Sequence, residues 1–142
     1  NEHESRAREL YEIQTGRICD EVGFIVHPAH MQIGCSPDGL IGADGGWEAK
    51  CPYTPAVHLQ TLLHGMPAEH MAQVQGGMFC SNRAYWDFVS FHPQFPDGMQ
   101  LYIERIDRDD AYIRDMEDKL LNAVAEINLN VKQLLEKYGV LQ

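Results

Sequence analysis

Residues 36–40 read SPDGL and residues 47–51 read WEAKC, and these two stretches decide the fold. Between them, residues 43–46 read ADGG, and an Asp followed by glycines supplies the positive-φ positions that a tight connection needs. The sequence therefore predicts a β-hairpin in which Asp38 and Glu48 are neighbours.

Side chains on a β-strand alternate between its two faces, and this rule sorts the residues of the second strand. Glu48 and Lys50 are predicted to share one face, while the apolar or small side chains of Trp47, Ala49 and Cys51 share the other. We expect the apolar face to meet a core and the ionic face to line a cleft.

Two acids and one amine in a small volume are typical of a metal-dependent phosphodiesterase. Neighbouring carboxylates repel unless a cation neutralises them or one stays protonated. Oxygen ligands without a His or Cys cluster favour Mg²⁺ or Mn²⁺ over Zn²⁺. Such an ion polarises a phosphoryl oxygen and lowers the pKa of a bound water, while Lys50 orients that water or offsets charge in the transition state. The alternative is that these acids are only turn and surface residues.

The acid followed by Glu-x-Lys resembles the PD-(D/E)xK nuclease core, and its surroundings resemble the YqaJ-type viral recombinases, the phage lambda exonuclease family. Four segments carry this resemblance in the family's order, within residues 1 to about 92. They are residues 3–16 (HESRARELYEIQTG), 35–40 (CSPDGL), 48–54 (EAKCPYT) and 70–75 (HMAQVQ).

The resemblance implies an α/β fold with a restriction-endonuclease-like core, in which a central mixed β-sheet is flanked by helices. It implies a Mg²⁺-dependent exodeoxyribonuclease, with Mn²⁺ able to substitute, that digests linear double-stranded DNA from its ends. The strand would be degraded 5′→3′, leaving 3′ overhangs for a single-strand annealing protein in phage-type recombination. The resemblance further implies a homotrimer, encoded by a phage or prophage and acting in the bacterial cytoplasm.

The resemblance also implies metal ligands, namely Asp38, Glu48, the carbonyl oxygen of Ala49, and Glu4. Glu4 continues the inward-facing stripe of a helix predicted for residues 2–15, which agrees with this role. From its spacing alone, Glu4 is better explained as a first-turn acid favoured by the helix dipole.

Lys50 and Gln73 are the residues that the resemblance implies for positioning the attacking water. Gln73 lies in a helix predicted for residues 67–81, and as a solvent-facing residue it would need no such role. Residues 53–58 read YTPAVH and lack the Arg or Lys with which relatives often grip a terminal 5′-phosphate. Ser36 remains as a candidate phosphate contact.

The rest of the chain is predicted to alternate strands and helices in one nuclease domain, residues 1–142, to which a longer protein would add an N-terminal segment. The last helix spans roughly 45 Å, longer than one small sheet can cover, so part of it is expected to meet another subunit or a missing segment. The further predicted elements are strands 23–27, 31–35, 84–91 and 99–106 and helices 55–64 and 109–138.

The amino-acid composition of the chain limits the functions that the protein could have. The 142 residues include 11 basic and 21 acidic side chains, and a net charge of -10 argues against broad electrostatic adhesion to DNA. The protein would therefore contact DNA through a local strip of basic residues or through metal ions. The four cysteines form no C-x-x-C pair, which is typical of reduced packing residues. The sequence has no run of apolar residues long enough for a membrane span.

Two alternative functions remain open. One is a repair or helicase-associated nuclease with the same core that acts on single strands or flaps, although its iron-sulfur members need four spaced thiolates that this sequence does not arrange. The other is a non-catalytic DNA-end-binding module. The intact set of Asp38, Glu48 and Lys50 argues against the second, because a binding protein gains nothing from two acids beside a phosphate.

Overall fold

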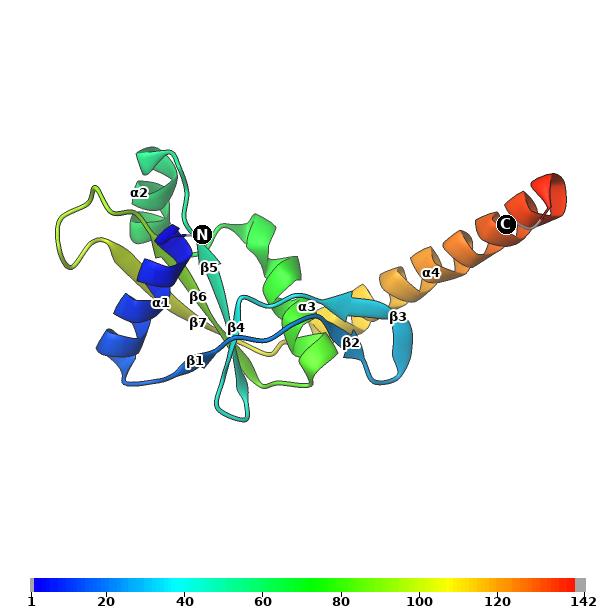
Figure 1. Ribbon diagram of the computed structural model, residues 1–142, viewed down its shortest axis with the longest axis horizontal. Coiled ribbons are helices and arrows are strands. Elements are labelled where there is room, and N and C mark those ends of the chain that lie inside the picture. The colour runs from blue at the N-terminus through cyan, green and yellow to red at the C-terminus, as the bar shows by residue number, and fades with distance from the viewer. Residues whose placement is uncertain (1, 140–142) are drawn as a thin grey trace. The chain divides into compact units, whose positions relative to one another are not determined.

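A five-stranded mixed sheet organises the first part of the chain in the computed structural model, which describes residues 2–139 (Figure 1). The chain divides into two compact units, the first ending at Arg108 and the second beginning at Asp109. The strands are β1 (Cys19–Asp20), β2 (Ile25–His27), β3 (His30–Cys35), β4 (Gly39–Ile41), β5 (Gly45–Lys50), β6 (Tyr85–Phe91) and β7 (Leu101–Asp107). The helices are α1 (Glu2–Thr15), α2 (Pro55–His64), α3 (Met71–Ser81), which follows a 3₁₀ turn at Ala68–His70, and α4 (Asp110–Tyr138).

The strand order of the sheet is β1-β4-β5-β6-β7, and β2 and β3 form a separate two-stranded ribbon. β5 and β6 run parallel, whereas the other neighbours in the sheet are antiparallel. The parallel pair needs a crossover, which the chain supplies through α2 and α3. This topology confirms the predicted α/β fold with a central mixed sheet.

The two faces of the sheet carry different helices (Figure 1). On one face, Tyr11 of α1 packs against Trp47 of β5, with ring centroids 5.9 Å apart, in a core that also contains Phe91. On the other face, Trp86 of β6 lies against α3 at Gly77. The alternation of side chains along β5 therefore determines which helix each residue meets.

The predicted hairpin is formed by β4 and β5, but the expectation that Gly45 and Gly46 supply its positive-φ positions is wrong. Gly45 and Gly46 do not have positive φ; in this connection Gly42 does, at 54°. Gly45 and Gly46 begin β5, where a Cβ would collide with the rings of Tyr85 and Trp86. Close approach by β6 explains them, and this approach depends on residues far away in the sequence.

The other predicted elements form to within a few residues of their expected bounds. The exception is β1, a two-residue strand that pairs with β4 and is too short for any alternation pattern to show. Inside α3, a Cβ on Gly77 would lie 2.7 Å from the Trp86 ring, whereas nothing lies within 4 Å of one on Gly76. Packing against the sheet thus explains one glycine of the pair.

The second unit consists of α4, one continuous helix as predicted. Asp109 caps its N-terminus by accepting a hydrogen bond from the backbone N–H of Tyr112, at 3.0 Å. No helix within residues 2–139 is long and apolar enough to cross a membrane. Large apolar side chains are exposed along the helix: Leu121, Ile127, Leu129, Val131, Leu134 and Leu135.

Candidate active site

The end of β5 holds the ionic residues of the candidate active site. The ammonium nitrogen of Lys50 lies 3.1 Å from a carboxylate oxygen of Glu48, which confirms that the two side chains share a face of the sheet. Glu48 is only 4 % exposed, because Phe88 lies beside it on β6 in the parallel register. A carboxyl group this deeply buried must have partners or lose its charge.

Asp38 precedes β4 and lies beside this pair, as the hairpin predicts. Its Oδ2 accepts a hydrogen bond from the backbone N–H of Ala49, at 3.0 Å, and Gly39 pairs with Trp47 in the antiparallel ladder. The hydrogen bond attaches one acid to the peptide next to the other acid. The hairpin register therefore fixes Asp38 and Glu48 as neighbours.

The environment of Glu48 raises its pKa from 4.5 to about 7. Burial is the largest cause and the negative charge of Asp38 is the second, while Lys50 opposes both by lowering the pKa. A buried carboxyl group beside a second acid fits a divalent cation, whose charge would offset both the lost solvation of Glu48 and its repulsion from Asp38. The repulsion argued from the sequence is thus present in the structure.

The donor set decides which ion fits best. Asp38 and Glu48 offer only oxygen atoms, and within residues 2–139 no three side chains of His, Cys, Asp or Glu converge closely enough to hold a metal ion by themselves. Mg²⁺ is commonly bound by one or two carboxylates while it keeps several waters, and it does not require a cage of side chains. The residues present therefore fit Mg²⁺ or Mn²⁺ better than Zn²⁺.

Arg8 of α1 connects the helix to this hairpin. Its guanidinium donates hydrogen bonds to the backbone carbonyls of Cys19, at 2.9 Å, and Asp38, at 2.7 Å. Glu4 lies one helical turn earlier, with a carboxylate oxygen 3.9 Å from Arg8. After burial, the charges of Glu4 and then Asp38 raise the pKa of the Cys51 thiol, to about 11. Glu4 therefore lies on the same side of the hairpin as Asp38, but its carboxylate is paired with Arg8.

His70 is a neighbour of Lys50 for which no role was predicted. Its ring stacks on Phe88, with centroids 5.5 Å apart. Burial lowers the pKa of His70, and the positive charge of Lys50 lowers it further. The signal was available, because His70 opens the segment 70–75 that carries part of the resemblance, but only the fold places it beside β5.

Gln73 and Ser36 are both exposed, and neither is seen bonded to Asp38, Glu48 or Lys50 in the part of the chain that the structure describes. The other glutamine of the same segment, Gln75, is buried and donates a hydrogen bond to the carbonyl of Asp107, at 3.0 Å. Gln75 therefore has a packing role, while Gln73 remains accessible on α3. The predicted roles of Gln73 and Ser36 stay predictions.

Comparisons with known proteins give one sequence family and a set of similar structures. A family model described as YqaJ-like viral recombinase domain matches residues 1–84. The structure of an alkaline exonuclease (LHK-Exo) from Laribacter hongkongensis is 42 % identical, with a TM-score of 0.92, and the match covers 96 % of this chain and 70 % of that chain. LHK-Exo in complex with dAMP matches with the same values.

A second, more distant structure shows the same fold. The phage related exonuclease from Haemophilus somnus 129PT is 14 % identical, with a TM-score of 0.72, over 94 % of this chain and 71 % of that chain. No curated protein matches this sequence. The mixed sheet with flanking helices and a long C-terminal helix is thus an arrangement shared with known exonucleases.

Proposed function

This chain belongs to the YqaJ-like viral recombinase family, and from that membership we propose that it is a metal-dependent exodeoxyribonuclease that digests linear double-stranded DNA from its ends. The observation that carries the proposal is the buried Glu48 with its raised pKa, placed beside Asp38 and ion-paired with Lys50. The 42 % identity to an alkaline exonuclease over almost the whole chain supports it.

Asp38, Glu48, the carbonyl of Ala49 and Glu4 are the residues that we propose to hold Mg²⁺, with Mn²⁺ as a substitute; Glu4 would have to turn from Arg8 to join the other two acids. When bound, the ion would polarise the scissile phosphate and lower the pKa of the attacking water. A proton on Glu48 competes with this binding, because its pKa is about 7. Binding is therefore expected to be strongest at alkaline pH.

Lys50 has a different role in the proposed reaction. Its side chain is one-third exposed, so Lys50 can reach solvent at the site while its ammonium group stays paired with Glu48. We expect Lys50 to orient the attacking water and to offset the negative charge that develops on the phosphate. Gln73, accessible on α3, would assist in positioning the water, and Ser36 would contact a phosphate.

The finer parts of the proposal rest on the family. The direction would be 5′→3′, and the product would carry 3′ overhangs for a single-strand annealing protein in phage-type recombination. The active form would be a homotrimer in the cytoplasm of a bacterial host. The exposed apolar side chains of α4 are consistent with subunit contacts, since oligomer interfaces have apolar cores.

A digestion assay tests the proposal. Linear duplex DNA labelled at the 5′ or the 3′ end, covalently closed circles and single strands are each incubated with Mg²⁺. We expect wild type to degrade only the linear duplex and to release the 5′ label first, while Asp38→Asn and Lys50→Ala lose at least about a hundredfold in rate. Asp97→Asn, an exposed loop acid, is the matched control.

The outcomes separate the alternatives. Intact DNA under both Mg²⁺ and Mn²⁺ would contradict the nuclease and leave a binding module. Preferential cleavage of single strands would support the repair-type nuclease, and rapid cutting of closed circles would contradict end dependence. Earlier release of the 3′ label would reverse the proposed direction.

A further inference from the structure

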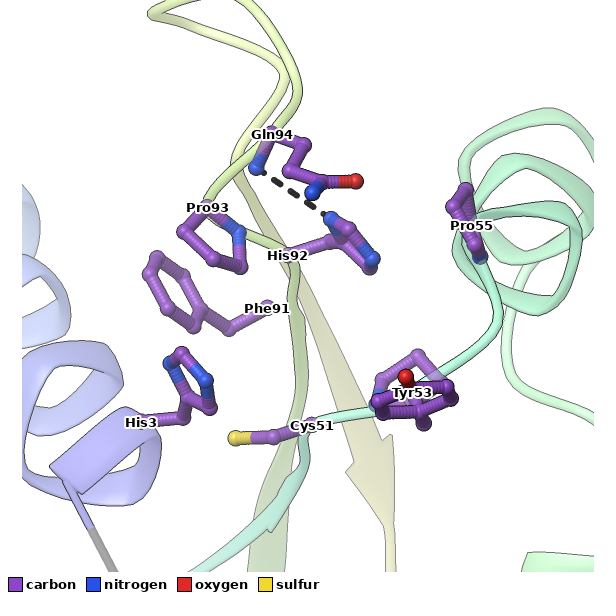
Figure 2. Close-up of a pocket in the computed structure, with 9 residues that line it drawn as sticks. His3, Cys51, Tyr53, Pro55, Phe91, His92, Pro93 and Gln94 are labelled. Atoms are coloured by element: carbon purple, nitrogen blue, oxygen red, sulfur yellow. Dashed lines mark hydrogen bonds between the residues drawn. The ribbon is translucent and has the colours of Figure 1, made fainter.

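A cavity of about 610 Å³ lies where the two parallel strands end. β5 ends at Lys50 and β6 at Phe91, and the residues that continue both strands form much of the cavity wall. In open α/β sheets, ligands bind outside the carboxyl ends of parallel strands. The lining residues, shown in Figure 2, are His3, Phe91, the segment 51–53, Pro55 and the segment 92–94.

The wall carries no Lys, Arg, Asp or Glu side chain. Without a Lys or Arg in its wall, the cavity offers no ion-pair partner to an anion such as a free phosphate. An uncharged group fits this cavity better.

The shape of the wall favours a flat ligand. Phe91 lines the cavity next to the ring of His3, with centroids 6.2 Å apart. At the rim, Tyr53 is 99 % exposed and is held between Pro52 and Pro55, which restrict the backbone around it (Figure 2). An exposed aromatic ring on a stiff segment is a stacking platform that costs little conformational entropy to use.

His92 gives the cavity a directed polar group. Its side chain is only 4 % exposed, and its Nδ1 accepts a hydrogen bond from the backbone N–H of Gln94, at 3.2 Å. In the neutral ring the proton therefore lies on Nε2, which becomes a donor. No hydrogen bond to Nε2 is seen within residues 2–139, and Figure 2 shows this edge of the ring turned away from Gln94 toward the side of Pro55.

We propose that this cavity binds the base of the nucleotide whose phosphate lies at the Glu48–Lys50 end of β5, a step that rests on the proposed nuclease function. The base would stack on Tyr53 and accept a hydrogen bond from Nε2 of His92 through a ring nitrogen or carbonyl oxygen. Cys51 lines the cavity and directly follows Lys50, the last residue of β5, so the cavity lies at the same end of this strand as the proposed active site. The similar LHK-Exo has been solved in complex with dAMP, a ligand of this chemical class.

The first test removes the base from the substrate. Duplexes that lack the base of the terminal nucleotide at each strand end are compared with normal duplexes. The initial rate of nucleotide release is measured for both. We expect the abasic ends to raise the KM of wild type about tenfold, because stacking and hydrogen bonding to one base contribute roughly 1–3 kcal/mol. Equal KM values on both substrates would overturn the proposal and leave the nuclease function standing.

The second test uses variants of the cavity wall. Tyr53→Ala should raise the KM for normal ends most of the way toward that for abasic ends, since the hydrogen bond from His92 remains, and should leave the abasic value unchanged. His92→Phe is the companion variant that removes the hydrogen-bond donor. Because Tyr53 is almost fully exposed, Tyr53→Ala keeps its fold even if the substitution of the buried His92 disturbs folding. Met31→Ala removes an 89 % exposed side chain elsewhere and is expected to change neither value.

The third test needs no cleavage. dAMP is titrated into the protein while the imidazole resonances of His92 are followed by NMR, with deoxyribose 5-phosphate as the ligand without a base. We expect dAMP to shift these resonances and to bind at least about tenfold more tightly than the sugar phosphate. Equal binding of the two, or no shift at His92, would overturn the proposal, as would a cavity filled by another protein segment. A protein that binds dAMP but digests no DNA would instead contradict the nuclease function.

Discussion

Asp38 accepts its hydrogen bond from the peptide nitrogen of Ala49, the residue that lies between Glu48 and Lys50. A backbone donor does not change rotamer, so the hydrogen bond anchors the Asp38 carboxylate to the strand that carries Glu48, whose own carboxylate is paired with Lys50. The site is consequently preorganised before any ion or substrate arrives, which reduces the reorganisation needed during the reaction.

The buried Glu48 should make the protein less stable as the pH rises. Its folded-state pKa of about 7 lies above the ordinary 4.5, so between these values the folded chain holds a proton that the unfolded chain has released. The free energy of unfolding therefore falls from pH 4.5 to about 7 and stays low above it, by on the order of 3 kcal/mol. Glu48→Gln should abolish this fall, as measured by urea unfolding in EDTA at pH 5 and 8. Asp97→Asn should keep it, and an unchanged slope in Glu48→Gln would contradict the assignment.

Mg²⁺ should offset the loss of folding stability that the buried, ionised Glu48 causes. An ion that binds only the folded protein stabilises it by about 2.7 kcal/mol at a hundred times its Kd, which a thermal melt at pH 8 detects. Wild type should melt at higher temperature with Mg²⁺ or Mn²⁺, and Asp38→Asn should show little shift. A full shift in Asp38→Asn would place the ion elsewhere.

Arg8 should influence metal affinity without touching the ion. Its fork spans the carbonyls of Cys19 and Asp38, and the single ammonium of a lysine cannot satisfy both. Arg8→Lys is expected to weaken Mg²⁺ binding roughly tenfold or more, as loss of a supporting partner does at other metal sites. Isothermal titration checks this, with the exposed Arg6→Lys as control; equal affinities would show that the clamp is only structural.

Gly76 and Gly77 form a matched pair for a packing test. Gly77→Ala should destabilise the protein by roughly 1–3 kcal/mol, because the new methyl group would overlap the Trp86 ring. Gly76→Ala meets nothing within 4 Å and should stabilise α3 by up to about 1 kcal/mol. Chemical denaturation of both variants provides the measurement, and effects of the same sign would contradict the packing described.

The sequence predicted those parts of the site that depend on neighbours along the chain. Strand alternation placed Glu48 and Lys50 together, and the hairpin brought Asp38 to them. The approach of β6 to Gly45 and Gly46 was missed, because it depends on residues some forty positions away.

The same limit applies to the surroundings of the site. His70 beside Lys50 follows from the packing of the crossover on the sheet, which no local pattern encodes. The cavity at the strand ends combines α1, the segment after β5 and the segment after β6, so it has no contiguous sequence signature. The polar group of the cavity is His92, which lies in a loop. The turn residues of this loop predict the loop itself but no binding role for His92.

The parallel register of β5 with β6 sets an order of events when the protein is made. Gly45 can pair with Tyr85 only after the whole crossover has been synthesised, and such long-range pairing forms late and slowly. When the ribosome has synthesised the hairpin, the chain therefore contains Asp38 and Glu48, but the parallel pair of β5 and β6 has not yet formed. Until β6 has been made, the chain carries Asp38 and Glu48 but lacks the neighbouring strand beside which Glu48 is buried.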